Sequence, residues 1–383
     1  MNNKKTIELK IKLFNFLIQL ISWLVPKKKG LIVFKQFHNP NQFTGNIKAL
    51  ILYITDNHPE YEAVLVSQNK AIIKEASKYD IKIESNHNSI LKLLLRAQFI
   101  VLDVANPMLS SGRFNIIQVW HGSGFKNIGA LHKSTNPNRG RFTNHTKKDH
   151  QNDRVVVTTS KADAKKKKLS FGTNNNAITG LPRNDIFFSP KNSNNKIKKV
   201  YSLQFYDKII SYTPTFRDYE TFPPFTEKNW QELNEILKVQ NYVFVVKKHP
   251  WDSLISVPSN YSNIIDLSNT IKDVQELLLI TDILISDYSS IVTDFAITGK
   301  PMLFYMYDFE LYKKDRSIYY DLPTILPKPI VYDSKDFLSK IKNLSWLNSN
   351  EYLDSYAKFQ EMFHRYKDGN SCMRVVEEIK KLN

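Results

Sequence analysis

The 383-residue chain contains a single cysteine, Cys372, so no disulfide bond can form within it. Scarce cysteine is typical of proteins in a reducing compartment. Acidic residues are also in deficit, because 37 Asp and Glu stand against 54 Lys and Arg, and the formal net charge is +17. A surplus of this size predicts an anionic partner; nucleic acid, anionic lipid and phosphorylated substrates all qualify.

Several common ligand-binding motifs are missing from the sequence. It contains neither GxGxxG nor GxxxxGKS/T, which argues against the usual NAD and P-loop sites. No Cys/His spacing is typical of a metal site, and we expect neither a metal nor a cofactor. Aromatic-basic stacking motifs are missing too, so we do not expect nucleic acid as a partner. Phosphate groups would instead be bound by Arg, Lys, His and helix N-termini.

The N-terminal stretch Thr6–Val25 is apolar and is followed by Pro26 and three lysines, with no small-residue cleavage site of a signal peptide. Its polar residues recur at spacings of four and three, which places them on one narrow stripe of a helix. They are Glu8, Lys12, Asn15, Gln19 and Ser22. We expect residues 1–29 to form an amphipathic helix at an anionic membrane surface. The alternatives are a helix packed on the protein's own core, a cytosolic dimer contact, or a true membrane span.

After residue 30, short β-branched runs alternate with helical stretches, which predicts parallel sheets with helices on both faces. The predicted strands are Leu31–Lys35, Ala63–Ser67, Phe99–Val104, Ile116–Trp120, Arg154–Thr158, Lys208–Tyr212, Tyr242–Lys247, Asp282–Ser286, Pro301–Tyr305 and Ile330–Tyr332. The predicted helices between them are Asn46–Thr55, Lys70–Tyr79, Gln275–Thr281 and Ile291–Thr298.

A polar stretch, Pro190–Lys199, interrupts this alternation and is interpreted as a linker or exposed loop. The prediction is an α/β protein with two doubly wound domains, at residues 30–190 and 200–370, and a C-terminal helix end at 371–383. Ligands in such folds bind beyond the carboxyl ends of the strands, so we expect a cleft between the two sets of ends. The run Lys165–Lys168 is interpreted as the solvated face of a helix, with contact to anionic lipid as the alternative.

Two of five polar motifs lie in the first predicted domain. In QVWHGSGFK a strand runs into His121, which can act as a general base near neutral pH. Gly122 and Gly124 permit a tight turn and let backbone N–H groups approach a phosphate. In GLPRND, Arg183 offers a planar fork suited to phosphate. A structural histidine and an ordinary loop arginine are the alternatives.

The other three motifs follow strands of the second predicted domain. In YTPTFRD, Thr213 and Thr215 can bond phosphate oxygens and Arg217 can neutralise them, although an ordinary turn explains the motif equally well. In KKHP, two lysines and His249 meet at one strand end, which core packing explains poorly. In SDYSSIVTD, two serines begin a helix, where they either cap it or bind phosphate, and Asp294 follows one turn later.

WHGSGFK, GLPRND, YTPTFRD, KKHP and SDYSSIVTDFAITGKPMLFYMYD, in this order, resemble the CDP-glycerol glycerophosphotransferases of teichoic acid synthesis. The resemblance runs from about residue 30 to about residue 370 and implies a GT-B fold of two Rossmann-like domains. It also implies an enzyme at the cytoplasmic membrane face, a CDP-glycerol or CDP-ribitol donor, release of CMP, and an undecaprenyl-diphosphate-linked glycan as acceptor. The family's important histidines fall on His121 and His249. Its donor-contacting positions fall on Trp120, Gly122, Ser123, Gly124, Arg183, Thr213, Pro214, Thr215, Lys247, Lys248, Ser289, Ser290 and Asp294.

Two departures from the family pattern touch the expected donor site. Ser123-Gly124 replaces the frequent Thr-Pro, and Lys248 replaces a frequent proline, so glycerol and ribitol both remain open. Length and the apolar N-terminal helix resemble the primase group, which adds the first glycerol phosphate. A chain-extending polymerase and a nucleotide-sugar glycosyltransferase of the same fold are the alternatives. We expect His121, Arg183, His249 and Ser289 to converge around one diphosphate.

Overall fold

The computed structural model describes residues 2–39, 41–132, 147–188, 192–217, 219, 221–249, 252 and 254–383. The chain forms two compact units. Unit 1 consists of Met1–His121, Ile128–Asp185 and Asp368–Asn383, and unit 2 consists of Gly122–Asn127 and Ile186–Lys367. The chain therefore leaves unit 1 for six residues directly after His121, and it returns to unit 1 for its last helix.

Unit 1 is built on a parallel sheet of seven strands in the order β3-β2-β1-β4-β5-β6-β7. The strands are β1 (Lys28–Lys35), β2 (Glu62–Val66), β3 (Lys82–Glu84), β4 (Ala97–Leu102), β5 (Ile116–Gln118), β6 (Asp153–Thr158) and β7 (Asn176–Ile178). The order reverses between β1 and β4, where Ile32 pairs with Phe99. This reversal is the topological switch point at which doubly wound sheets bind ligands.

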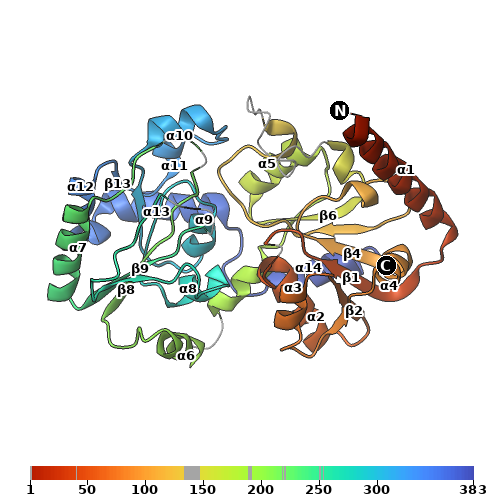
Figure 1. Cartoon of the computed structure of the whole chain (residues 1–383), viewed down its shortest axis with the longest axis horizontal. Helices are drawn as coiled ribbons and strands as arrows, with labels where there is room; N and C mark the ends of the chain where they lie inside the picture. Colours follow the sequence, from red (N-terminus) through yellow and green to blue (C-terminus); the bar gives the residue numbers. More distant parts are fainter. Residues whose placement is uncertain are drawn as a thin grey trace. The chain divides into compact units, whose positions relative to one another are not determined.

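Helices cover both faces of this sheet because alternate residues of its strands point to opposite sides. Ile32 and Phe34 of β1 join one core cluster and Leu31 and Val33 join another. The helices of unit 1 are α1 (Asn2–Leu24), α2 (Gly45–Asn57), α3 (Lys70–Ala76), α4 (His87–Arg96), α5 (Lys161–Phe171) and α14 (Ser371–Lys380), with 3-10 turns η1 (Pro107–Leu109), η2 (Gly129–Leu131) and η3 (Lys147–His150). In Figure 1, α14 is the blue helix among the red-to-yellow elements of this unit.

The C-terminal helix α14 is held in unit 1 by a carboxylate and by apolar packing. Asp185 accepts hydrogen bonds from the backbone N–H groups of Ser371 (2.9 Å) and Cys372 (2.8 Å), the first two residues of the helix. An acidic side chain at a helix N-terminus satisfies donors that lack a partner within the helix. Cys372 and Val376 are buried in the same cluster as Ile32. The lone cysteine is thus a core residue.

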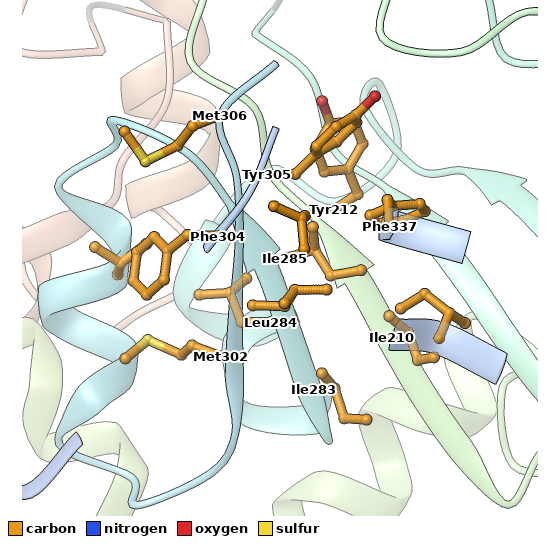
Figure 2. Close-up of a cluster of buried hydrophobic side chains, with 14 of the residues drawn as sticks. Ile210, Tyr212, Ile283, Leu284, Ile285, Met302, Phe304, Tyr305, Met306 and Phe337 are labelled. Carbon is orange, nitrogen blue, oxygen red and sulfur yellow. The ribbon is translucent and has the colours of Figure 1, made fainter. Parts of the chain in front are cut away.

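Unit 2 repeats the architecture with a six-stranded parallel sheet in the order β10-β9-β8-β11-β12-β13. The strands are β8 (Lys208–Tyr212), β9 (Tyr242–Val246), β10 (Ile264–Asp266), β11 (Ile283–Ser286), β12 (Met302–Tyr305) and β13 (Ile330–Val331). The helices are α6 (Asn192–Val200), α7 (Glu227–Val239), α8 (Val274–Ile280), α9 (Ile291–Ala296), α10 (Phe309–Asp315), α11 (Leu322–Ile325), α12 (Ser334–Lys342) and α13 (Asn350–Phe363), with 3-10 segments η4 (Pro182–Phe188), which begins in unit 1, and η5 (Leu344–Asn348). Figure 2 shows Ile285, Phe304 and Tyr305 of its central strands among the buried side chains of the core.

The predicted α/β class with two parallel sheets is confirmed, and each predicted strand is present to within three residues at either end. Three strands were not predicted: β3, β7 and β10. Each has only three residues and lies toward a sheet edge, which is too short for a periodic signal.

The interpretation of Pro190–Lys199 as a linker or loop is wrong from residue 192, since Asn192–Val200 forms helix α6. Ile197 packs against the core of unit 2, and Lys198 and Lys199 lie in the last turn, where cations favour a helix.

Helix α1 is attached to the rest of unit 1 through Gln19 and Ser22 of its polar stripe, and most of its apolar face points outward. Gln19 Nε2 donates to the carbonyl oxygens of Pro107 (3.3 Å) and Met108 (3.4 Å), and Ser22 Oγ accepts from Arg113 N (2.8 Å). On the outer side the large apolar residues are exposed, including Leu13, Phe16, Leu20, Trp23 and Leu24. Ile18 is an exception, because it is buried in the core cluster that contains Leu31 and Val33. Most of the large apolar side chains described for α1 face away from the core. Among the described helices, none is long and apolar enough to cross a membrane.

The lysine run of α5 is not a uniformly solvated face, which corrects the interpretation of Lys165–Lys168. Lys165 and Lys168 are exposed, but Lys166 and Lys167 are buried. Lys167 Nζ lies 3.0 Å from a carboxylate oxygen of Asp163 and donates to the carbonyl oxygen of Val157 (2.8 Å). Lys166 and Lys167 are therefore part of the interior of unit 1 and cannot contact a lipid surface.

Lys167→Ala should destabilise the protein by about 3–5 kcal/mol, because it leaves the Asp163 carboxylate buried without its cation. Urea unfolding followed by circular dichroism measures this loss. Lys165→Ala, on the exposed face of the same helix, should stay within about 0.5 kcal/mol of the wild type. Equal effects of the two substitutions would contradict the assignment of Lys167 to a buried ion pair.

Candidate active site

His121 lies just beyond β5, between two aromatic rings of unit 1. The ring of His38 stacks on it at a centroid distance of 4.2 Å, and the ring of Trp120 stacks on it at 4.3 Å. Trp120 adopts a left-handed backbone conformation (φ 50°), which is uncommon for a bulky residue and is typical of functional sites. The turn after β5 therefore presents the imidazole in one fixed orientation.

A backbone carbonyl selects the tautomer of His121. Its Nδ1 lies 3.0 Å from the carbonyl oxygen of Asp103, and since a carbonyl oxygen can only accept, Nδ1 carries the proton. Nε2 of the neutral ring then holds a lone pair. Burial, followed by the neighbouring His38, lowers the pKa of His121 well below its usual value. A neutral imidazole with a free Nε2 has the properties of a general base.

The side chain of Asp103 fixes the loop that carries His38. Its carboxylate accepts from the N–H groups of Phe37 (2.8 Å) and His38 (3.2 Å). Gln36 closes the same loop by donating to the carbonyl oxygens of His38 (2.8 Å) and Gln42 (2.6 Å). Burial raises the pKa of Asp103 to about 7, although the two backbone donors act in the opposite direction. One residue thus positions both histidines, through its carbonyl and its carboxylate.

Arg183, which lies 62 residues after His121 in the sequence, contacts the backbone of His121. Its Nη1 donates to the carbonyl oxygen of His121 (3.0 Å), and its N–H donates to Oδ1 of Asn46 (3.1 Å). Asn46, at the start of α2, also donates to the carbonyl oxygens of Val119 (3.1 Å) and Trp120 (2.9 Å). The structure therefore joins the WHGSGFK and GLPRND motifs within unit 1 through an asparagine that sequence reasoning missed.

At the switch point of unit 2, between β8 and β11, Asp287 holds the YTPTFRD loop. Its carboxylate accepts from Thr215 N (3.0 Å) and from Thr215 Oγ1 (2.6 Å). The Thr215 hydroxyl is therefore committed to a carboxylate. The hydroxyl of Thr213, by contrast, is buried with no hydrogen-bond partner in the part of the chain that is described, and Pro214 between them is buried.

The guanidinium of Arg217 is already paired with two carboxylates, so it is not available to bind a phosphate group. Its guanidinium donates to Asp287 (2.6 Å) and makes a two-point contact with Asp308 (2.9 and 2.8 Å). All three side chains are almost fully buried. Tyr219 also donates to Asp308, at 2.6 Å. We therefore assign Arg217 to shaping the loop through Asp287 and leave it out of the proposed phosphate ligands.

The KKHP motif follows β9. Lys247 Nζ donates to the carbonyl oxygen of Ser268 (3.1 Å), and Lys248 Nζ donates to that of Ile255 (2.7 Å) and lies 3.6 Å from Asp266. His249 is exposed and its ring lies 5.3 Å from that of Phe216. Partial desolvation lowers the pKa of His249, and Lys126 and Lys247 act in the same direction while Asp252 opposes them. Lys247 also has a lowered pKa, caused first by burial.

The two serines of SDYSSIVTD adjoin the WHGSGFK segment inside unit 2. A Cβ atom added to Gly124 would lie 2.9 Å from Cβ of Ser290, so only glycine fits there. Thr293 Oγ1 donates to the carbonyl oxygen of Ser123 (2.7 Å). Ser289 Oγ accepts from Ile291 N (3.3 Å), the first residue of the six-residue helix α9, whose N-cap residue is Ser290.

Asp294, also expected to contact the donor, is buried in unit 2, where Gln275 Nε2 donates to it at 3.4 Å. Gly122 is the residue at which the chain enters unit 2. The structure thus forms two groups of site residues, one in each unit. The convergence of His121 and Arg183 with His249 and Ser289 stays a prediction. Among the described residues, no cluster of His, Cys, Asp and Glu is arranged to hold a metal ion.

Comparison with known proteins matches residues 17–381 to the family model "CDP-Glycerol:Poly(glycerophosphate) glycerophosphotransferase". A teichoic acid glycerol-phosphate primase of Bacillus spizizenii is 29% identical over 88% of this chain and 90% of its own length. A teichoic acid poly(ribitol-phosphate) polymerase of the same organism is 27% identical over 97% of this chain, which spans 59% of that relative. The wall teichoic acid polymerase TagF, in a structure soaked with CDPG, superposes with a TM-score of 0.80 at 21% identity, covering 100% of this chain and 98% of the other. The family resemblance and the fold predicted from the sequence are confirmed.

Asp103→Asn should change how stability depends on pH. The folded pKa of about 7 lies above the ordinary 3.8, so the folded protein holds a proton that the unfolded chain releases. The stability from this group is present below pH 3.8 and is lost as pH rises through 7. Wild-type stability minus that of the variant should fall by up to about 1.4 kcal/mol per pH unit in this window. Urea titrations at several pH values measure the slope, and the exposed control Asp56→Asn should leave it unchanged.

Proposed function

Because the chain belongs to the CDP-glycerol:poly(glycerophosphate) glycerophosphotransferase family, we propose that it transfers glycerol phosphate from CDP-glycerol to a lipid-linked glycan and releases CMP. The product would be a teichoic acid or a related cell-wall or capsule polymer. The observation that carries the proposal is the His121 site, where the Asp103 carbonyl holds the proton on Nδ1 and leaves Nε2 to act as a base.

In the proposed reaction an acceptor hydroxyl attacks the β-phosphorus of CDP-glycerol. Nε2 of His121 takes the hydroxyl proton as the new O–P bond forms. The P–O bond to CMP breaks, and its electron pair leaves on the CMP phosphate. Positioning and electrostatic stabilisation supply most of the acceleration in phosphoryl transfer, so fixed donors and cations matter more than covalent chemistry.

The cations and hydroxyls of the five motifs would hold the donor. We assign Lys247, His249 and the Ser289–Ser290 turn to the pyrophosphate from unit 2, and Arg183 from unit 1. Support comes from the guanidinium of Arg183, which is already bonded to the backbone of His121. Lys248 donates to a backbone carbonyl and faces Asp266, which suits it to shaping the loop.

We propose the priming step rather than chain extension. The support is the similarity to the glycerol-phosphate primase, which is 29% identical over 88% of this chain, and we propose an undecaprenyl-diphosphate-linked acceptor. Chain extension with glycerol phosphate or ribitol phosphate, and nucleotide-sugar transfer, are the alternatives. The experiment below separates these alternatives, because it compares the donors and measures the mass of the lipid product.

The wild-type protein, incubated with a lipid-linked disaccharide, should release CMP from CDP-glycerol and add a single glycerol phosphate. His121→Ala should lower kcat by about 10²–10⁴-fold, because it removes the general base. Since the pKa of His121 is lowered, the acid limb of the wild-type rate profile should lie below pH 6.5. Chromatography of CMP and mass analysis of the lipid product measure both results.

CDP-ribitol and UDP-sugars, tested in parallel, identify the competing donors. Near-normal turnover of His121→Ala would exclude the base assignment. Release of UDP without release of CMP would replace the proposed function by glycosyl transfer.

We further propose that the enzyme is peripheral to the cytoplasmic side of the cell membrane and binds anionic lipid through α1. The support is the outward apolar face of this helix, with Phe16 55%, Leu20 50% and Trp23 64% exposed. Exposed apolar area of this extent is costly in water and favourable at a lipid interface. Lys29 follows the helix with an exposed side chain, where it can meet anionic headgroups. Lys27 Nζ instead donates to the carbonyl oxygen of Leu95 (2.8 Å), and Lys28 pairs with Glu62.

The double substitution Leu20→Glu/Trp23→Glu should weaken binding to anionic vesicles by about 10²-fold, since burying each large apolar side chain contributes about 1.5–3 kcal/mol. Vesicle co-sedimentation measures the affinity. Val239→Glu, at an 88% exposed apolar residue of unit 2, is the matched control and should bind as the wild type does. Unchanged binding by the double variant, together with loss of a dimer in sedimentation velocity, would instead assign the face to self-association.

A further inference from the structure

Unit 1 contains a pocket of about 310 Å³ at the carboxyl ends of β1 and β2 that the proposed transfer step does not use. Its floor is formed by residues that follow these strands, including Phe37 and Ser67. Its wall is formed by Leu91 and Leu94 of α4 and by Phe14 of α1. The carboxyl ends of parallel strands are where doubly wound sheets bind their ligands.

The lining of this pocket combines apolar surface with a single fixed cation. No acidic side chain lines it, and Lys35 is its only Lys or Arg. In the described part of the chain Lys35 forms no ion pair, and its Nζ lies 5.2 Å from the ring centroid of Phe37. Burial lowers the pKa of Lys35, because the pocket withdraws water from the amine without supplying an acid. A ligand that complements such a pocket carries an anion next to an apolar chain.

The pocket also connects the outer face of α1 to the proposed base. Phe14 lines the pocket and belongs to the exposed apolar face of α1. Phe37 lines it from the other side and directly precedes His38, whose ring stacks on His121 at 4.2 Å. The Asp103 carboxylate holds Phe37 and His38 together through their N–H groups. The pocket therefore adjoins both the apolar face of α1 and the loop whose His38 stacks on His121.

We propose that this pocket binds the lipid end of the acceptor, with the hydrocarbon nearest the headgroup against α1 and α4 and the adjoining phosphate paired with Lys35. The inference rests on the proposed function, because it locates the acceptor of that transfer. Charge complementarity and the continuity of the pocket with the apolar face of α1 both favour this occupant. A soluble nucleotide is disfavoured because Lys35 is the only Lys or Arg of the lining, whereas a nucleotide diphosphate carries several negative charges.

Two variants of the full-length enzyme test the assignment. Lys35→Gln removes the cation, and Leu91→Trp fills the cavity from a partly buried position on α4. Each is assayed for CMP release with an undecaprenyl-diphosphate-linked disaccharide in vesicles and with a water-soluble analogue in which a phenyl group replaces the diphosphate and lipid. Both variants should raise KM for the lipid acceptor about tenfold or more, Lys35→Gln through loss of a charge-assisted contact and Leu91→Trp through loss of space for the hydrocarbon. KM for the soluble acceptor and for CDP-glycerol should not change.

Lys74→Gln, at an exposed lysine of α3, is the matched control and should behave as the wild type. An equal loss with both acceptors, or no change in KM with either, would overturn the proposal. Weakened binding of the variants to phosphatidylglycerol vesicles without acceptor would assign the pocket to bulk lipid instead. If the wild type releases no CMP with any acceptor, the proposed function itself fails, which is a distinct result. If Leu91→Trp does not fold, Lys35→Gln alone decides between these outcomes.

Discussion

The site in each unit depends on one buried carboxylate that bridges the two strands at the switch point. Asp103 follows β4 and accepts from the loop after β1, and Asp287 follows β11 and accepts from the loop after β8. Apart from the additional edge strand β7 of unit 1, the strand order is the same in both sheets, so these residues occupy equivalent positions. Backbone N–H groups beyond the end of a parallel strand have no ladder partner, and a buried donor left unpaired is costly. The carboxylate satisfies these donors and at the same time fixes the loops that carry the proposed site residues.

The two carboxylates differ in how their charge is compensated. Asp287 meets the guanidinium of Arg217, which Asp308 holds from the other side. Asp103 forms no ion pair among the described residues, and burial raises its pKa to about 7. An ionised carboxylate beside His121 would raise the pKa of the imidazole and weaken its use as a neutral base. The bond to His121 instead comes from the uncharged backbone carbonyl of Asp103, which fixes the tautomer without adding charge.

The sequence was sufficient for elements with a strong local pattern. Buried β-branched runs such as Tyr242–Lys247 predicted the central strands, and motif order predicted the family. It was insufficient where the deciding contact lies far along the chain. The role of Asn46 arises from bonds to Trp120 and Arg183, and no local pattern marks it. The burial of Lys167 likewise depends on Asp163 and on the carbonyl of Val157, which a run of four lysines does not reveal.

Helix α1 illustrates how a chain can attach an element by its polar side. Gln19 and Ser22 bond to backbone groups near η1, and Gly112 permits this closeness, since a Cβ atom there would lie 2.6 Å from Ser22 Oγ. Hydrogen bonds between these side chains and the backbone give the helix a defined orientation, and Ile18 anchors it in the core while its outward apolar residues stay exposed. The exposed apolar face of α1 is therefore available for contact with lipid. A helix attached in this way can lose its apolar face to mutation without unfolding the unit beneath it, which separates the energetics of lipid binding from those of folding.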